Sequence, residues 1–319
     1  MRIFPRRCVA IMATALASAV ALTGCTRGPG ETEATSTPGS AVAASEERVA
    51  SLGLGDVDTL LALGVTPVAI APWGSEGDAD PSGVGPWSKE LLGDAEPVKI
   101  FNTGAGFTAD VLEQVTASDP SLIVAVNQAV DANAKSSLEK IAPTVVKPEE
   151  FPDWQVPWEK QVVTIAEAVG KEAEGAELVE KTEQTFVDFR KEHADVQGKK
   201  AAIVMPYDGK IGLYTSGDGR GQFIENLGFE IPAELEGDGS SFFVDYAPEN
   251  YAALNGVDYL FVLDYYGAVD ALKDDPTFQN LEVVKDGRVR YLETDVGNAM
   301  SMPNPVTIPW ASEKVADKL

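Results

Sequence analysis

The sequence predicts an α/β protein of two lobes with parallel sheets, joined by one long α-helix. Short apolar runs alternate with amphipathic segments on both sides of the middle of the chain, as in parallel sheets covered by helices. Between these two regions, residues 171–193 contain no proline and have apolar side chains at helical spacing. The chain of 319 residues is long enough for two hydrophobic cores.

The segment 171–193 is the expected connection between the lobes. Ala176, Val179, Phe186 and Phe189 recur on one helical face, and charged residues fill the opposite side. At about 1.5 Å per residue the helix would be roughly 34 Å long, which is about the length of a domain. We interpret it as a rigid linker, with the ligand site in the cleft between the lobes.

Alternating strands and helices assign residues 46–170 to the first lobe. Its strands are expected at 49–52, 67–70, 98–101, 122–126 and 144–146, and its helices at 56–63, 110–117 and 133–141. A further helix at 158–169 ends at Gly170, a residue type that often terminates helices. The linker helix is assigned to 171–194.

The same alternation continues in the second lobe, residues 195–319. Strands are expected at 200–205, 211–215, 259–263 and 289–292, and helices at 222–227, 248–254, 276–284 and 306–318. Residues 109–126 and 247–263 each place a glutamate in the first turn of a short helix that is followed by a strand. This weak internal repeat indicates two related halves.

The N-terminus has the pattern of an export signal. Three arginines precede an apolar run over residues 8–22, which is too short to span a bilayer well. The run ends in Leu-Thr-Gly-Cys at 22–25, which resembles a bacterial lipobox. We therefore predict a signal peptide at 1–24, a lipid on Cys25, a flexible tether over 25–45, and an extracytoplasmic protein anchored to the bacterial cell membrane. A signal cleaved elsewhere, with an unmodified cysteine, is the alternative.

Charge and composition exclude several functions. The formal net charge of −25 repels nucleic acid and anionic lipid headgroups, although an acidic coat also keeps an exported protein soluble. The single histidine, His193, lies at the end of the linker segment and is expected to act as a helix C-terminal charge. One histidine excludes multi-histidine zinc sites and Ser-His-Asp catalysis. The sequence also contains no P-loop.

Residues that follow the predicted strands are the candidates for ligand contact, because ligands of open parallel sheets bind beyond the carboxyl ends of the strands. In the first lobe they are two tryptophans in loops and two polar pairs at strand ends: Trp73, Trp87, Asn102, Thr103, Asn127 and Gln128. In the second lobe they are Tyr214, Arg220, Phe243, Tyr265, Tyr266 and Met300. Loop packing, helix caps and turns are the competing explanations.

Two of these loops have specific chemistry. Arg220 lies on a glycine-rich turn before an expected helix, and both features favour an anion or an oxygen-rich chelate. A surface ion pair with one of the many acids is the alternative. Residues 53–56 read Gly-Leu-Gly-Asp, which fits a ligand-contacting loop or a tight turn with Asp56 as helix N-cap equally well.

Four segments in the right order resemble the iron-siderophore type of periplasmic binding protein, the helix-linked substrate-binding subunit of bacterial ABC importers. The opening strand, helix and second strand correspond to 48–73, and further motifs correspond to 112–126, 138–146 and 277–292. The similarity spans nearly the whole chain after the tether. Ser121, Phe278 and Gly256 depart from the residues that are common in the family, and none of them is a predicted ligand contact.

The resemblance implies two Rossmann-like lobes of the class III type and capture of a ferric siderophore for an ABC permease dimer. It also implies a binding protein and no enzyme. The iron stays in its chelator, so no cofactor and no protein metal ligand are expected, and the protein is expected to be a monomer. Arg220 is similar in position to an arginine that contacts siderophore oxygens. Glu113 and Glu249 correspond to acids that meet arginines of the permease, although a capping box from Asp110 to Glu113 and a helix start at Glu249 explain them structurally.

Other ligands stay open at this point. Haem or cobalamin could occupy the same fold, and direct binding of ferric iron through Tyr265 and Tyr266 is a weaker alternative. A hydrolase would need a histidine base that the sequence does not offer at a suitable place. Among siderophores, catecholates would depend on Arg220 and lysines, and neutral hydroxamates on the tryptophans. The acidic surface slightly favours hydroxamate or mixed chelates.

Overall fold

The computed structural model describes residues 47–74, 76–77, 79–237, 241–265 and 267–319. Residues Glu46–Leu319 form one compact unit. The predicted signal peptide, the tether, the lipid on Cys25 and the candidate Tyr266 lie outside the described residues. None of the helices in the described ranges combines the length and the apolar character that crossing a membrane would require.

The first sheet is wholly parallel, as predicted, with strand order β3-β2-β1-β4-β5. Its strands are β1 (Val49–Ser51), β2 (Ala69–Ile70), β3 (Val98–Lys99), β4 (Leu122–Ala125) and β5 (Thr144–Val146). The strand order reverses between β1 and β4, so the loops that follow these two strands lie at the point where open α/β sheets bind ligands.

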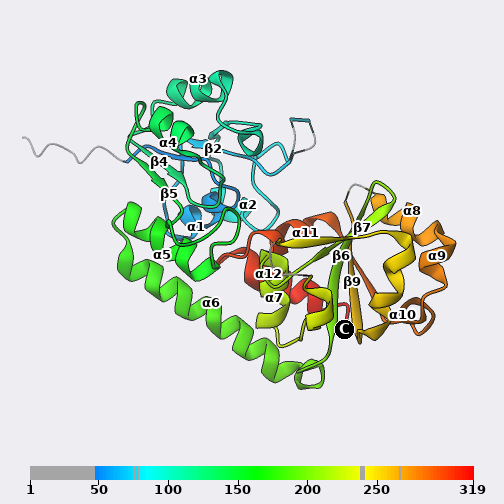
Figure 1. Ribbon diagram of the computed structural model, residues 1–319. Coiled ribbons are helices and arrows are strands. Elements are labelled where there is room, and N and C mark those ends of the chain that lie inside the picture. The colour runs from blue at the N-terminus through cyan, green and yellow to red at the C-terminus, as the bar shows by residue number, and fades with distance from the viewer. Residues whose placement is uncertain (1–46, 75, 78, 238–240, 266) are drawn as a thin grey trace, which may run out of the picture. The chain divides into compact units, whose positions relative to one another are not determined.

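Helices cover both faces of this sheet (Figure 1). They are α1 (Asp56–Ala62), α2 (Lys89–Leu92), α3 (Ala109–Ala117), α4 (Ala132–Leu138) and α5 (Trp158–Ala168), with a 3₁₀ turn at Thr103–Ala105. One apolar cluster unites Val111, Val115 and Leu138 with the sheet, and another unites Leu60 and Ile165 with its other face. The short helix α2 was not predicted.

Helix α6 (Glu172–Glu192) follows the first sheet and precedes the second, so the two lobes are joined by one long helix of 21 residues. Phe186 and Phe189 are buried in the core of the second lobe, as the periodicity predicts. Ala176 is exposed, so its assignment to the apolar face was wrong. Gly175 and Thr182 complete the buried face instead.

The second sheet has the order β10-β9-β6-β7-β8 and is mixed. Its strands are β6 (Ala201–Tyr207), β7 (Lys210–Tyr214), β8 (Phe243–Tyr246), β9 (Tyr259–Leu263) and β10 (Val289–Leu292). Strands β6, β9 and β10 are parallel, whereas β7 pairs antiparallel with both of its neighbours, β6 and β8. The reason is the Asp208–Gly209 turn, in which both residues have positive φ, as in a tight β-hairpin. An all-parallel second sheet was therefore the wrong expectation.

The helices of the second lobe pack on both faces of its sheet, around two apolar clusters. They are α7 (Gly219–Asn226), α8 (Ala268–Asp274), α9 (Pro276–Gln279), α10 (Glu282–Lys285), α11 (Thr294–Ser301) and α12 (Thr307–Ala316). Further 3₁₀ helices are Ala194–Val196, Ala233–Leu235 and Pro248–Gly256. The predicted single helix at 276–284 is two short ones, and the helix predicted at 248–254 is 3₁₀ throughout. Strand β8 and helices α8 and α11 were not predicted.

Candidate functional site

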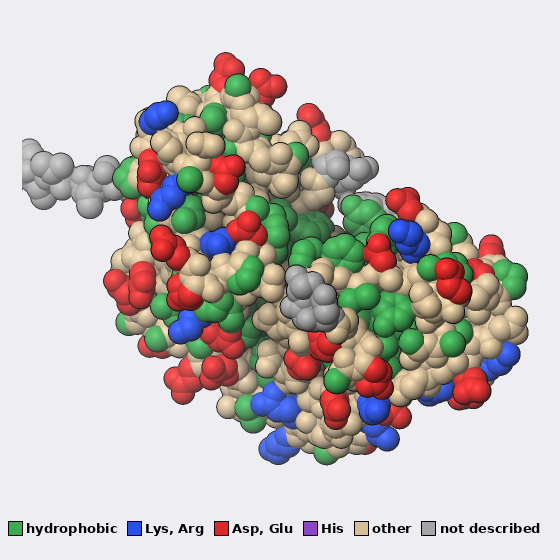
Figure 2. All heavy atoms as spheres, viewed as in Figure 1, with side chains coloured by type: hydrophobic (Ala, Val, Ile, Leu, Met, Phe, Trp, Pro, Cys, Tyr) green, Lys and Arg blue, Asp and Glu red, His purple; other side chains and the backbone are tan. Residues whose placement is uncertain are grey.

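Two cavities with walls from both lobes meet at Trp73. One, of about 260 Å³, is lined by Leu54, Trp73, Gly104, Asn127, Trp154, Asp218, Arg220, Phe242, Ser301 and Met302. The other, of about 230 Å³, lies between the loop 79–89 and the start of α11, with Trp73, Asp80, Trp87, Lys89, Asp295 and Asn298 among its lining residues. Figure 2 shows hydrophobic side chains gathered in a hollow in the middle of the face. We call the two cavities together the cleft.

A buried carboxylate shapes the loop that follows β1. The Asp56 carboxylate accepts the backbone N–H groups of Val126 and Asn127, at 2.7 and 3.1 Å, and so ties this loop to the end of β4. A Cβ on Gly53 would collide with the same carboxylate. Burial raises the pKa of Asp56 to about 7, against the opposing effect of these N–H donors. Of the two interpretations of this loop, the one with Asp56 as helix N-cap is wrong, because Gly55, with a φ of +81°, occupies that position, and Leu54 of the same loop lines the first cavity.

A second buried carboxylate connects the lobes. Asp58, which is 2 % exposed, accepts the Ser88 hydroxyl at 2.5 Å and the side-chain amide of Asn304 at 3.1 Å. Burial raises its pKa to about 6, and the hydrogen bonds of Ser88 and Asn304 oppose that rise. The indole N–H of Trp87 lies near this carboxylate and favours its charged form, but it is buried without completing a hydrogen bond.

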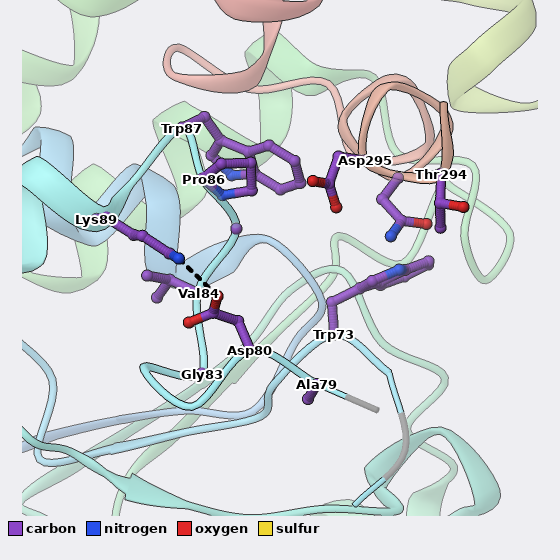
Figure 3. A pocket seen from close by; sticks show the side chains of 12 residues that line it. Trp73, Ala79, Asp80, Gly83, Val84, Pro86, Trp87, Lys89, Thr294 and Asp295 are labelled. Atoms are coloured by element: carbon purple, nitrogen blue, oxygen red, sulfur yellow. Dashed lines mark ion pairs between the residues drawn. The ribbon is translucent and has the colours of Figure 1, made fainter. Parts of the chain in front are cut away.

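Trp73 and Trp87 stand on opposite sides of the second cavity, with Asp295 of α11 beside the opening (Figure 3). Trp87 packs edge-on against Trp310 of α12, with ring centroids 5.4 Å apart. Lys89 is paired with Asp80 at 2.6 Å. Both predicted tryptophans therefore line the cleft, and Trp87 also belongs to the packing between the lobes.

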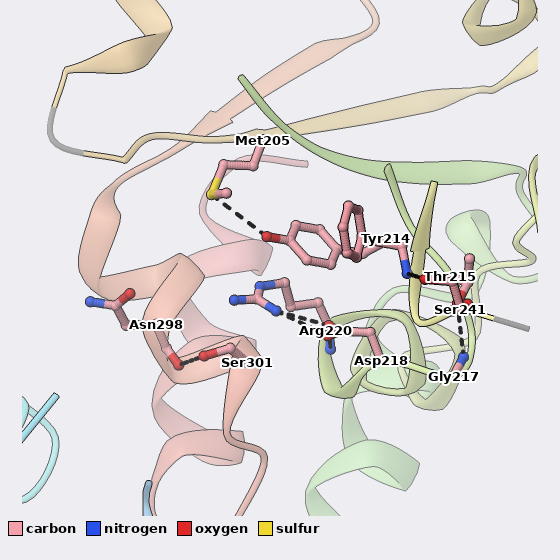
Figure 4. A network of polar contacts seen from close by, with 10 residues as sticks. Met205, Tyr214, Thr215, Gly217, Asp218, Arg220, Ser241, Asn298 and Ser301 are labelled. Atoms are coloured by element: carbon pink, nitrogen blue, oxygen red, sulfur yellow. Dashed lines mark hydrogen bonds and ion pairs between the residues drawn. The ribbon is translucent and has the colours of Figure 1, made fainter. Parts of the chain in front are cut away.

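Arg220 lines the first cavity from the N-terminal turn of α7. Asp218 caps this helix by accepting the backbone N–H of Arg220 at 2.8 Å. The same carboxylate accepts two hydrogen bonds from Nη1 of the arginine, at 3.0 and 3.1 Å. The guanidinium also lies over the Tyr214 ring, 4.1 Å from its centroid (Figure 4). The predicted arginine is thus present in the cleft, fixed by an acid and an aromatic ring.

Tyr214 packs under the Arg220 guanidinium and does not line the cleft. It is 8 % exposed, and its hydroxyl lies 3.6 Å from the sulfur of Met205. Burial raises the pKa of Tyr214, with a smaller opposing effect from the nearby Arg220. Tyr214 is not among the residues that line either cavity.

Of the four polar residues predicted at strand ends of the first lobe, one lines the cleft and three do not. Asn127 lines the first cavity and donates its side-chain amide to the Leu54 carbonyl at 2.7 Å. Gln128 is buried, and its side chain is engaged by the backbone of Leu52 and Ala129, so the structure does not bring it to the cleft. Asn102 is exposed in a left-handed conformation and Thr103 is buried, and neither lines the two cavities.

In two places a residue one or two positions along the chain from the predicted one lines the cleft. Phe242 contributes to the first cavity, whereas Phe243 begins β8 and packs on the second-lobe core. Met300 is completely buried in that core, so ligand contact by Met300 does not fit the structure, and Met302 lines the cavity instead. The physical reason is the side-chain direction, which changes with each residue along a strand or helix. Tyr265 is 48 % exposed and lines neither cavity.

Sequence reasoning missed Trp154 and Asp218. Trp154 lies in a loop rich in proline and acidic residues, just before α5, and has a φ of +65°. Its large ring in a loop was a signal of the same kind that identified Trp73. Asp218 could have been found as a helix N-cap next to Arg220.

Glu113 and Glu249 are both exposed, one in each lobe. Glu249 is in the first turn of its 3₁₀ helix, as expected. Glu113 lies in the second turn of α3, because Thr108 caps that helix by accepting the N–H of Val111. The expected capping box from Asp110 to Glu113 was therefore wrong, and Glu113 does not cap this helix.

Comparisons with known proteins agree with this geometry. The sequence profile of the family described as periplasmic binding protein matches residues 49–296. The chain is 25 % identical to the Fe(3+)-citrate-binding protein YfmC of Bacillus subtilis (strain 168), over 92 % of each chain. A periplasmic solute binding protein of Mycobacterium smegmatis is 28 % identical, with a TM-score of 0.74 over 86 % of this chain and 91 % of that one. PiaA of Streptococcus pneumoniae TIGR4 in complex with ferrichrome is 26 % identical, with a TM-score of 0.71 over 86 % and 92 %. The predicted resemblance and fold class are confirmed.

Proposed function

Because the chain belongs to the periplasmic binding protein family, we propose that it captures a ferric siderophore outside the cytoplasm and delivers it to an ABC importer. The observation that carries this proposal is the cleft, whose walls combine aromatic rings with one arginine. Relatives that match nearly the whole chain support it, since one is named for ferric citrate and another was solved with ferrichrome. The chain acts by binding, without catalysis.

The walls of the cleft suit an intact chelate. Trp73, Trp154 and Phe242 offer apolar faces to the organic framework of a chelator, and Arg220 and Asn127 offer hydrogen-bonding groups to its oxygens. The iron needs no ligand from the protein because the chelator already fills its coordination sphere. Helix α6 joins the lobes as one unbroken element, so closure on the ligand is expected to be small.

Delivery requires contacts outside the cleft. A lipid on Cys25 would hold the protein at the membrane, and the exposed Glu113 and Glu249 would each meet an arginine of one half of the permease dimer. An exposed carboxylate on each lobe, near the start of a helix in two segments of similar sequence pattern, supports this assignment. The protein would dock as a monomer.

The test is a titration of tryptophan fluorescence with ferric chelates, since Trp73, Trp87 and Trp154 lie in or beside the cleft. Ferrichrome and ferric citrate are the first probes, and haemin and cobalamin are the comparison ligands. We expect saturable quenching by at least one ferric chelate and none by haemin or cobalamin. Tight binding of haemin or cobalamin alone would assign the cleft to another ligand.

A further inference from the structure

Resting on the siderophore function above, we propose that the cleft selects ferric chelates that are neutral or positively charged, of the hydroxamate type. Triply negative tris-catecholate complexes are bound much more weakly. The reason is the balance of charge on the walls of the cleft, which the sequence alone did not reveal.

Arg220, the one arginine among the described residues that line the cleft, is already neutralised. Nη1 of Arg220 bonds both oxygens of Asp218, and the two side chains are 14 % and 9 % exposed. Asp218 cannot easily turn away, because it also caps α7 through the backbone N–H of Arg220. A ligand therefore meets a hydrogen-bonding dipole in the first cavity, and no uncompensated positive charge.

The second cavity adds negative charge. Its lysine, Lys89, is paired with Asp80. Asp295, at the start of α11, is exposed on the wall and forms no ion pair within the described part of the chain. Among the described residues that line the two cavities, the ionisable groups are two cations and three carboxylates, which leaves an excess of one negative charge.

The apolar walls of the cleft and the net charge of the whole chain also favour a neutral or cationic chelate. Leu54, Trp73, Trp154, Phe242 and Met302 provide apolar contact for the carbon framework of a hydroxamate chelator. The chain as a whole has a formal charge of −25, which repels polyanions and attracts cations during approach. A triply negative complex would enter such a cleft against both the local and the long-range field. We expect a preference on the order of a hundredfold for the neutral chelate over the triply negative one at low salt.

The test uses the full chain, purified in detergent, and three probes of different charge: ferrichrome, which is neutral, the cationic ferric complex of desferrioxamine B, and a triply negative ferric tris-catecholate. Dissociation constants come from tryptophan quenching at low and high salt. Support for the proposal is tight binding of the first two probes, with at least about hundredfold weaker binding of the tris-catecholate. Equal or tighter binding of the tris-catecholate overturns the charge selection and leaves siderophore capture intact. A folded protein that binds none of these three chelates and no ferric citrate overturns the function itself.

The substitution Asp218→Asn tests the carboxylate that neutralises Arg220. Asparagine still caps a helix, so α7 keeps its start while Arg220 gains an uncompensated charge. The preference against the tris-catecholate should fall about tenfold or more. The matched control is Asp119→Asn, which removes one negative charge from a side chain that is 91 % exposed. This variant should keep the wild-type preference for the neutral chelate over the tris-catecholate. An unchanged preference in a folded Asp218→Asn variant contradicts the proposal, and the wild-type panel decides the question where that variant does not fold.

Discussion

Lowering the pH should stabilise this protein through Asp58, and the substitution Asp58→Asn should remove that effect. The pKa of Asp58 is raised from 3.8 to about 6, because burial disfavours its charged form. Between these two values the folded chain binds more protons than the unfolded chain, so the free energy of unfolding rises as the pH falls through 6 and towards 3.8.

The magnitude follows from the two pKa values. A difference of about two pH units corresponds to roughly 3 kcal/mol once the pH is below both values, and about 1 to 2 kcal/mol of it develops between pH 8 and pH 5. Asp56 titrates in both proteins, so most of its own contribution cancels in the comparison. Loss of the repulsion that Asp58 exerts on Asp56 lowers the pKa of Asp56, which increases the difference in the same direction.

The assay is urea denaturation at pH 8 and pH 5, followed by tryptophan fluorescence. The wild type should gain about 1 to 2 kcal/mol more than Asp58→Asn between these pH values, with similar denaturant slopes. The exposed Asp119→Asn variant should follow the wild type. Parallel curves for the wild type and Asp58→Asn would refute the reasoning, because they would show that Asp58 has the same pKa in the folded and unfolded chains.

Three further outcomes are expected. Gly221→Ala should lower the free energy of unfolding by about 1–3 kcal/mol in urea denaturation, because its Cβ would collide with the Thr215 carbonyl oxygen. Gly256→Ala, where a Cβ meets nothing within 4 Å, is the matched control. Phe278→Ala should cost about 3–5 kcal/mol in the same assay, since its ring is completely buried. Trp73→Ala should weaken binding of a ferric chelate about tenfold or more without changing the unfolding midpoint, whereas Trp73→Phe should retain most of the affinity. Equal affinity of the wild type and Trp73→Ala for the chelate would show that Trp73 is not part of the site.

Local patterns predicted most of the elements. The strands at 122–126, 259–263 and 289–292 and the helix at 158–169 lie within a residue or two of the observed bounds, because each has apolar side chains at the period of its own conformation. Helix α11 escaped detection because Gly297 and Asn298 are poor helix formers, and packing against the sheet holds it in place. The mixed second sheet was missed although Asp208–Gly209 is a strong hairpin signal.

The sequence by itself determined the two α/β halves, the long helix between them and the loops in which a ligand would be sought, because strand, helix and turn preferences depend on neighbours within a few residues. Only the tertiary structure decided which side chains of those loops meet. It paired Asp58 with Asn304, 246 residues away, placed Met302 in the cleft and Met300 in the core, and gave Arg220 its neutralising acid. The physical reason is that burial, pKa and charge balance depend on the groups that docking brings within a few ångströms, and no local pattern records them.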